Sequence, residues 1–394
     1  MNKVIQQNFQ VQFNYNISFT EDVFRAENTF LKEVLTSVPS IRTAKAVVVL
    51  DQGLYAHQRQ LIDKIETYFQ TYHKNITLMG TPLIVDGGEK VKNNWNSVES
   101  VLELLNTQKI DRHSFIISVG GGAVLDMVGF ASAIAHRGVR LIRIPTTVLS
   151  QNDSGVGVKN SFNYFEKKNF LGTFQPPFAV INDSYFLDSL SDRDFRSGIS
   201  EAIKVALIKD VSFFEWIENN STLLNNRDSK TIEHLIFRCA ELHTEHIGTA
   251  GDPFEQGSSR PLDFGHWAAH KLEYLTNYKL THGEAVAVGI VLDSSYSYFK
   301  GFLTKEEMLR IITCFQQLNF QLDHELLFDP EDKNAINPEL IRGLEEFREH
   351  LGGELTIMLL KSIGKGGEIH EMEEEKLNES VAFIKTFVIN LHAV

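Results

Sequence analysis

Three histidines lie close together in the second half of the sequence: His266, His270 and His282. Apolar residues at i, i+3 and i+4 predict a helix over Phe264–Tyr274, which places His266 and His270 on one face. His282 follows a polar break and can return to the same place. Imidazole nitrogens and one carboxylate form an open three-ligand zinc site, which leaves a coordination position for a substrate. A single histidine is more often a packed or surface residue, but three in so short a stretch favour a metal site.

The spacing of the histidines does not determine which carboxylate completes such a site. Glu201 is the best candidate, because it lies in the apolar helical segment Gly198–Ile208. From spacing alone, a solvated charge on the helix surface explains Glu201 equally well.

A glycine triplet, Gly120-Gly121-Gly122, follows the strand-like run Ser114–Val119 and precedes a helical pattern. Glycines at this position let the backbone approach a phosphate, and the helix N-terminus offers free N–H groups. The triplet does not match the GxGxxG fingerprint of standard dinucleotide-binding folds, and a tight turn alone explains it about as well. Two features favour a binding loop: Asp126 lies on the helix that follows, and Thr146-Thr147 end the next strand. Ligands of α/β sheets bind where strands end in this way.

These residues need elements to position them, and the two halves of the chain differ. In the first half, strand-like apolar runs alternate with helical patterns; the runs are Ala46–Leu50, Pro82–Val85, Ser114–Val119 and Leu141–Ile144. This alternation predicts βα units and a parallel sheet. The second half carries helical periodicity over Gly198–Ile208, Thr231–Ile247, Phe264–Tyr274 and Glu284–Phe299, with a strand pattern only at Leu355–Leu360. We therefore predict an α/β domain over residues 1–190 and a mostly helical domain over residues 191–394.

The composition is that of a globular protein large enough for two cores: 394 residues, 43% hydrophobic and 23% charged. A formal net charge of −13 argues against nucleic-acid and anionic-membrane partners, which need a basic face. The two cysteines, Cys239 and Cys314, are too few and too far apart for a disulfide scaffold. The N-terminal residues contain no apolar stretch of a signal peptide, and no run of about 18 apolar residues predicts a membrane span. We expect a cytoplasmic protein.

Further motifs join the glycine triplet and the histidines. They are Gly120–Asp126, Arg137-Gly138, Pro145–Thr147, Gln151–Ser154 with Lys159, Lys168–Gly172, Ser197-Gly198 with Glu201 and Lys204, Asp263–His270 and Leu280–Glu284. In order and in spacing, from about Asp51 to His282, the chain resembles the 3-dehydroquinate synthase family of sugar-phosphate cyclases.

The resemblance implies an N-terminal α/β NAD-binding domain with a parallel sheet and a mostly α-helical C-terminal metal-binding domain. It places Zn²⁺, or Co²⁺ in its stead, on Glu201, His266 and His282. It places NAD on Asp51, Glu89, Lys92, Gly121, Gly122, Asp126, Thr146 and Thr147. It implies catalytic roles for Asp153, Lys159, Lys204 and His270. Further contacts with a small sugar-phosphate substrate are implied for Arg137, Lys168, Asn169, Glu245, Arg260 and Asp263.

The implied reaction is a phosphate-eliminating cyclisation. A ring alcohol is oxidised by NAD, phosphate is eliminated, the ketone is reduced again, and an intramolecular aldol addition closes a carbocycle. Lysines suit the phosphate region because they stabilise developing negative charge; Lys159, Lys168 and Lys204 would form this anion pocket in an otherwise acidic chain. Arg137 resembles an arginine that reaches the phosphate site of a neighbouring subunit, which implies a homodimer.

The chain departs from the family at a clamp for the substrate carboxylate. At fixed intervals before the first zinc-binding histidine, the family has a lysine, then an arginine, then an asparagine; here Glu245, Ser259 and Asp263 stand at those positions. A glutamate that faces a carboxylate repels it, by a few kcal/mol in a desolvated pocket. Arg260, one position away from Ser259, compensates only if the loop shifts.

Two substrate hypotheses follow, and one alternative function. The altered clamp favours a neutral sugar phosphate such as sedoheptulose 7-phosphate, whereas the retained His270 is typical of dehydroquinate synthase proper. An iron- or zinc-dependent polyol or glycerol dehydrogenase of the same fold is the alternative. Such enzymes typically have an aspartate where Glu201 stands, and they lack the Lys168-Asn169 motif.

Overall fold

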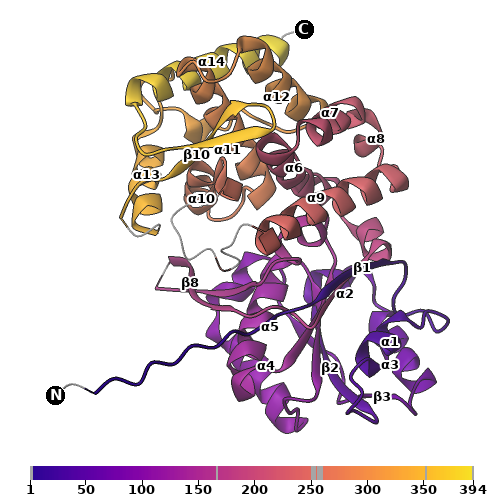
Figure 1. Cartoon of the computed structure of the whole chain (residues 1–394). Coiled ribbons are helices and arrows are strands. Elements are labelled where there is room, and N and C mark those ends of the chain that lie inside the picture. Colours follow the sequence, from indigo (N-terminus) through magenta and orange to yellow (C-terminus); the bar gives the residue numbers. More distant parts are fainter. Residues whose placement is uncertain (1–2, 166, 250–253, 255–260, 351–352, 393–394) are drawn as a thin grey trace.

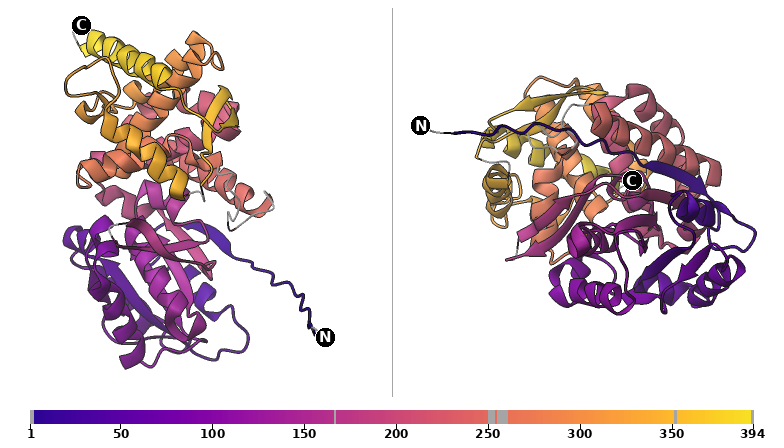
Figure 2. Two further views of the ribbon diagram at one scale, coloured as in Figure 1. Left: turned by 90° about the vertical axis from the view of Figure 1, so that its left-hand side faces the viewer. Right: turned by 60° about the horizontal axis from the view of Figure 1, so that its bottom comes forward.

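The computed structural model describes residues 3–165, 167–249, 254, 261–350 and 353–392. An N-terminal α/β part and a C-terminal helical part are stacked on one another, and residues 3–12 extend away from the body as an exposed segment (Figures 1 and 2). The class that the sequence predicted, a parallel α/β domain followed by a mostly helical domain, is confirmed. The division at residue 190 stays a prediction; helix α6 begins at Asp192.

The N-terminal part is built on a seven-stranded sheet whose neighbouring strands pair in parallel. The strand order is β1-β9-β6-β5-β2-β3, and β4 also pairs with β2. The strands are β1 (Asn16–Thr20), β2 (Ala44–Asp51), β3 (Ile76–Leu78), β4 (Leu83–Val85), β5 (Phe115–Gly120), β6 (Arg140–Pro145) and β9 (Ala179–Asp183).

The central strands are apolar on both faces because helices cover both. In β2, Val47 and Val49 contribute to one core, while Ala46, Val48 and Leu50 contribute to the other, as the alternation of a strand requires. Helices α1 (Phe30–Thr36) and α3 (Leu61–Thr71) belong to the second core, and α4 (Trp95–Thr107) and α5 (Gly122–Ile134) to the first. Short helix α2 (Gln52–His57) follows β2 directly.

Between the sheet and the helical part lie a turn and a hairpin that the sequence pattern did not predict. The π-helical turn η3 (Ser150–Ser154) follows β6, and the antiparallel hairpin β7 (Lys159–Tyr164) and β8 (Lys167–Phe174) packs on α5. Arg143 of β6 fixes this segment: its buried guanidinium donates to the carbonyls of Gly155, Gly157 and Lys159 and to Oδ1 of Asn160, at 2.7–3.0 Å.

The C-terminal part packs around α11 (His282–Phe299), which is buried along most of its length. Around it lie α6 (Asp192–Lys209), α10 (His266–Leu275), α12 (Lys305–Gln317) and α14 (Glu374–His392). The remaining elements are α7 (Val211–Asn219), α8 (Ser221–Asn225), α9 (Ser229–Thr249), α13 (Pro338–His350) and the hairpin β10 (Ile357–Ser362) and β11 (Lys365–Ile369). Among the described residues, none of the helices is long and apolar enough to span a bilayer.

Two glycines allow α11 to approach its neighbours closely. A Cβ at Gly283 would lie 1.9 Å from the carbonyl oxygen of Ser197 on α6, and a Cβ at Gly289 would lie 2.0 Å from that of Gly265. The first contact brings the start of α11 onto α6, which carries Glu201, and the second brings the start of α10 onto α11.

Candidate active site

The three predicted metal ligands meet where three helices converge. Glu201 lies in the middle of α6, while His266 and His282 are the first residues of α10 and α11. Nε2 of His266 is 3.6 Å and Nε2 of His282 is 3.2 Å from Oε1 of Glu201, and one ligand atom from each residue lies within 4.8 Å of the others. Two nitrogens and a carboxylate at this spacing match an open catalytic metal site.

The burial of Glu201 and the protonation state of His266 also fit a bound cation. Glu201 is fully buried, and its carboxylate is surrounded by the Lys204 ammonium and the Nε2 atoms of His266 and His282. A buried carboxylate is costly unless positive charge compensates it. Nδ1 of His266 lies 3.1 Å from the carbonyl oxygen of Phe264; an Nδ1–H donated there leaves the Nε2 lone pair directed at the centre. Burial and the neighbouring Lys204 lower the pKa of His266, which favours the neutral imidazole that binds metals.

Lys204, one turn after Glu201 on α6, is the cation that the protein itself supplies. Its ammonium is buried and contacts Oε2 of Glu201. Burial opposes the charge of Lys204, but Glu201 and Asp153 raise its pKa above the ordinary value. Burial likewise opposes ionisation of Asp153 and Glu201, yet Lys204 holds the pKa of both carboxyls below their ordinary values. Asp153, on η3, also lies 2.9 Å from Nδ1 of His243 on α9.

His270 and a carboxylate that the sequence analysis did not select extend the site from the metal ligands toward β8. Oε2 of Glu273 lies 3.2 Å from Nδ1 of His282, and both of its oxygens accept from Nζ of Lys168 at 3.0 Å. His270, one turn earlier on α10, has a ring centroid 5.4 Å from that of His266. Burial and then Lys168 lower the pKa of His270 well below its ordinary value, so its imidazole is neutral.

The predicted NAD residues gather at the carboxyl ends of β2, β5 and β6. Asp51 ends β2 and accepts from the N–H groups of Gly53 and Leu54; burial raises its pKa. Gly121 precedes α5 as its N-cap and provides no side chain to cap the free N–H groups of the helix. Thr146 and Thr147 follow the neighbouring strand, where Thr146 donates its backbone N–H to Gly120. Free N–H groups at a helix N-terminus between two strand ends fit the pyrophosphate of a dinucleotide.

A polar cluster connects this nucleotide region with the predicted substrate residues. Nζ of Lys92, which is 3% exposed, lies 2.8 Å from Oδ2 of Asp126 and 2.6 Å from Oδ1 of Asn169. Oγ of Ser161 on β7 lies 2.8 and 2.9 Å from the same two oxygens, and its single O–H can donate to either one. Oε1 of Glu89 lies 3.6 Å from Nζ of Lys92, and both residues belong to the short 3₁₀ helix η1 (Glu89–Asn93). The β7–β8 hairpin thus contributes to both predicted binding regions.

Comparison with known proteins shows which family has this arrangement of a nucleotide region and a metal site. The model of the 3-dehydroquinate synthase N-terminal domain matches residues 82–197, and that of the C-terminal domain matches residues 198–337. The 3-dehydroquinate synthase of Halorhodospira halophila is 32% identical over 342 residues, which cover 84% of this chain and 93% of that protein. This chain belongs to the 3-dehydroquinate synthase family. Family membership confirms the prediction of a phosphate-eliminating lyase of the cyclase kind.

Solved structures of other sugar-phosphate cyclases share the family fold. The 2-epi-5-epi-valiolone synthase of Streptomyces hygroscopicus subsp. jinggangensis 5008, solved with NAD⁺ and Zn²⁺, superimposes with a TM-score of 0.84 at 23% identity, covering 97% of this chain and 100% of that one. A 2-deoxy-scyllo-inosose synthase, solved with carbaglucose-6-phosphate, NAD⁺ and Co²⁺, has a TM-score of 0.74 at 21% identity and covers 94% and 96%. A probable glycerol dehydrogenase from Sinorhizobium meliloti 1021 reaches 0.59 at 13% identity, with coverage of 95% and 97%.

The other predicted substrate residues have fewer contacts with the metal ligands and their neighbours. Asp263 is half-buried in the turn before α10, and its charge acts on Lys204 and His266. Glu245 is exposed on α9, and its charge acts on Lys209. Arg137 is exposed after α5, with a positive φ of 63°. Lys159 begins β7 with an exposed side chain, and Arg260 and Ser259 lie outside the described residues. The roles of these residues stay predictions.

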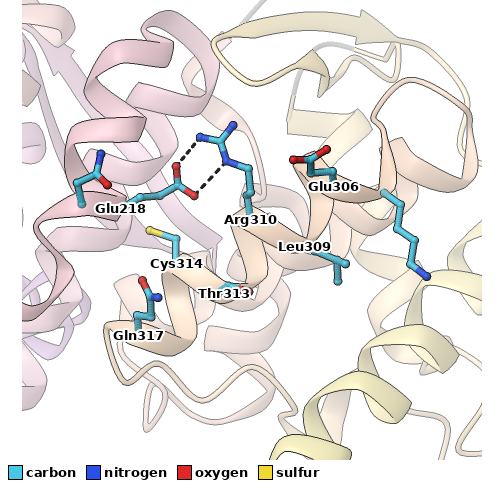
Figure 3. Close-up of a pocket in the computed structure, with 9 residues that line it drawn as sticks. Glu218, Glu306, Leu309, Arg310, Thr313, Cys314 and Gln317 are labelled. Atoms are coloured by element: carbon cyan, nitrogen blue, oxygen red, sulfur yellow. Dashed lines mark hydrogen bonds and ion pairs between the residues drawn. The ribbon is translucent and has the colours of Figure 1, made fainter.

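A surface hollow between α7 and α12 lies apart from these residues (Figure 3). Glu218 and Arg310 form an ion pair across it. Cys314 and Thr313 also line it. Because none of its lining residues belongs to the predicted site, we do not assign the chemistry to it.

Two residues near the centre, Glu273 and His243, were missed from the sequence. Glu273 could have been found, because it stands three positions after His270 and seven after His266, on the same helical face. His243 carries no such local signal: its partner Asp153 lies far earlier in the chain, and only the packing of α9 on η3 brings the two together.

Proposed function

We propose that this protein is an NAD- and zinc-dependent cyclase that converts a neutral heptulose phosphate, such as sedoheptulose 7-phosphate, into a carbocycle with release of inorganic phosphate. The observation that carries the proposal is the junction at α10. There the metal triad of Glu201, His266 and His282 continues through Glu273 to the phosphate-motif lysine Lys168. A metal centre that polarises an alcohol and an anion site within one connected cluster suit a reaction that oxidises an alcohol and expels phosphate.

Glu201, His266 and His282 would hold Zn²⁺, or Co²⁺ in its stead, the ions with which two related cyclases were solved. When bound, such an ion polarises a hydroxyl or carbonyl oxygen and lowers the hydroxyl pKa. The residues fit because the Glu201 carboxylate is fully buried and two imidazole Nε2 atoms converge on its Oε1.

NAD would lie across the strand ends, and it would supply the acceptor and donor of the hydride. Asp51 would receive ribose hydroxyls, and the uncapped N-terminus of α5 at Gly121-Gly122 would receive the pyrophosphate. Glu89, Lys92, Asp126, Thr146 and Thr147 would complete the site. Lys92 is already held in place by Asp126 and Asn169, so its ammonium needs little reordering to meet a phosphate or ribose oxygen.

The chain's own residues would orient the sugar and manage its charge. Lys168 and Asn169 on β8, with Lys159 on β7, would bind the phosphate and stabilise it as it leaves. Asp153 and Lys204 stay ionised beside each other and would hydrogen-bond substrate hydroxyls on the η3 side. The neutral imidazole of His270 can accept a proton from a bound hydroxyl during oxidation and return it when the ketone is reduced.

The preference for a neutral substrate is supported by the charges where the family clamp would lie. Asp263, rather than the family asparagine, is half-buried, and its charge acts on Lys204 and His266 of the site. Positions 245 and 259 carry glutamate and serine instead of lysine and arginine. A substrate carboxylate would therefore lose its cationic partners and gain a repulsive neighbour.

The test supplies purified enzyme with Zn²⁺ and NAD and either sedoheptulose 7-phosphate or the heptulosonate phosphate, while released phosphate is measured. We expect phosphate release from the neutral substrate at a kcat/KM at least about tenfold higher, and no net NADH, because the hydride returns in each cycle. Faster release from the carboxylate-bearing substrate would identify a dehydroquinate synthase proper. NADH accumulation from a polyol without phosphate release would instead support the dehydrogenase alternative.

We further propose a cytoplasmic homodimer. The support for the dimer is Arg137, whose exposed side chain follows α5 and resembles an arginine that completes a neighbour's phosphate site. Sedimentation should give twice the 44.7 kDa chain mass. If Arg137 acts across the interface, mixing Arg137→Ala with Glu201→Ala chains should restore part of the activity that each variant lacks alone. No restoration in confirmed heterodimers would contradict the role of Arg137.

A further inference from the structure

Glu273 is a buried carboxylate that contacts both halves of the site. It lies on α10 with 4% of its surface exposed. Oε1 and Oε2 both accept from Nζ of Lys168 at 3.0 Å, and Oε2 also lies 3.2 Å from Nδ1 of His282. Glu273 therefore lies between a predicted metal ligand and a lysine of the predicted phosphate site.

The contact with His282 determines which ring nitrogen faces the metal ligands. An Nδ1–H donated to Glu273 leaves the lone pair on Nε2, the atom that lies 3.2 Å from Glu201. A carboxylate that accepts from a ligating histidine also makes the other nitrogen a stronger ligand. Glu273 thus orients Nε2 of His282 toward Glu201, while its own oxygens contact Lys168 and Nδ1 of His282.

The contact with Lys168 gives Glu273 a second role. The two 3.0 Å contacts fix the ammonium at the end of a long, flexible side chain on β8, where the phosphate of the substrate would bind. When a phosphate pairs with Lys168, the lysine compensates less of the negative charge on Glu273. The carboxylate then accepts more strongly from His282, whose Nε2 becomes a better ligand.

We infer that Glu273 is a positioning residue that couples phosphate binding at Lys168 to metal binding at His282. The inference rests on the proposed metal and phosphate sites. Because coupling between two binding sites is reciprocal, phosphate should tighten Zn²⁺ binding and Zn²⁺ should tighten phosphate binding by the same factor.

The experiment measures the Zn²⁺ affinity of metal-free protein by competition with a chromophoric chelator, with and without inorganic phosphate. In wild-type protein, saturating phosphate should tighten Zn²⁺ binding by about fivefold or more. Glu273→Gln should weaken Zn²⁺ binding about 10- to 100-fold and abolish the effect of phosphate. Lys168→Met should keep most of the Zn²⁺ affinity but also lose the coupling, and the double variant should show no further loss of coupling.

The matched control is Glu346→Gln. Glu346, on α13, pairs with Lys271 of α10. This variant therefore also removes a carboxylate that pairs with a lysine, but the pair involves neither His282 nor Lys168. It should leave the Zn²⁺ affinity within twofold of the wild type. Thermal unfolding and far-UV circular dichroism of each variant verify that it is folded; Lys168→Met, which keeps Glu273, tests the coupling independently if Glu273→Gln does not fold.

Coupling that persists in Glu273→Gln would show that phosphate contacts the metal directly and would overturn the inference, as would Zn²⁺ affinity unchanged in that variant. Failure of the proposed function is distinguishable: the wild-type enzyme would then release no phosphate from either heptulose phosphate, whatever the Zn²⁺ affinities are.

Discussion

Replacing Lys204 by methionine tests whether the centre is an electrostatic cluster that needs a cation. Lys204 is 3% exposed, and its ammonium contacts Glu201, which is fully buried, while its charge also acts on Asp153. Methionine retains the volume of the aliphatic stem, so the cavity contribution to the loss is small. Removing one partner of a buried ion pair leaves an uncompensated charge, which costs about 3–5 kcal/mol. We expect metal-free Lys204→Met to lose stability in this range.

The assay is denaturant unfolding of metal-free protein, repeated with saturating Zn²⁺. Because a divalent cation beside Glu201 supplies the missing positive charge, Zn²⁺ should recover more stability in Lys204→Met than in wild-type protein. The control is Lys209→Met, later on α6 and exposed, which should change stability by less than about 0.5 kcal/mol. A loss below about 1 kcal/mol for metal-free Lys204→Met, or equal recovery by Zn²⁺ in variant and wild type, would refute the electrostatic reasoning.

Three further predictions concern the support of the site. Burial raises the pKa of Asp293 to about 7 although Trp267 donates a hydrogen bond to it. The stability that protonated Asp293 contributes to the wild-type protein should therefore be lost as the pH rises from the ordinary aspartate range to about 7. The stability cost of Asp293→Asn, measured by chemical unfolding between about pH 5 and pH 8, should therefore shrink up to about pH 7 and then level off; a constant cost contradicts this. Gly283→Ala places a Cβ 1.9 Å from the Ser197 carbonyl, so it should cost about 1–3 kcal/mol and weaken Zn²⁺ binding in the chelator assay. Arg143→Lys cannot replace all four buried hydrogen bonds and should cost about 2–4 kcal/mol in the same unfolding assay, with lower kcat; unchanged stability contradicts the role of Arg143.

The sequence predicted the metal triad because two of its members carry local signals. The helical spacing of His266 and His270 and the polar break before His282 place imidazoles near one another without knowledge of the fold. Glu201 carries no such signal: from spacing it could equally be a surface charge, and only the resemblance to a family selected it. Its burial depends on α11 packing on α6 and on α10 packing on α11, which are contacts between segments that a sequence pattern does not bring together.

The sequence predicted strands β2, β4, β5 and β6 of the sheet, and it missed the edge strands β1 and β3 and the buried but short strand β9. Buried β2 and β5 appear in the sequence as continuous β-branched runs. Strand β1, with partly exposed residues, pairs with β9, which comes much later in the chain, so its pattern is weak and its partner is distant. Strand β8 (Lys167–Phe174) is largely exposed and forms a hairpin on α5, and it carries Lys168 and Asn169. Its residues were found through their motif, not through their strand.

The predicted substrate clamp shows that a count of residues along the chain does not determine which way a side chain points. Counting from His266 selects Glu245, but residues two apart on a helix point about 200° apart. On α9, His243 lies 2.9 Å from Asp153, whereas Glu245 is exposed and acts on Lys209. The side chain that α9 presents to the predicted substrate site is therefore an imidazole. An imidazole carries no negative charge that would repel a carboxylate, so the electrostatic preference for a neutral substrate depends chiefly on Asp263.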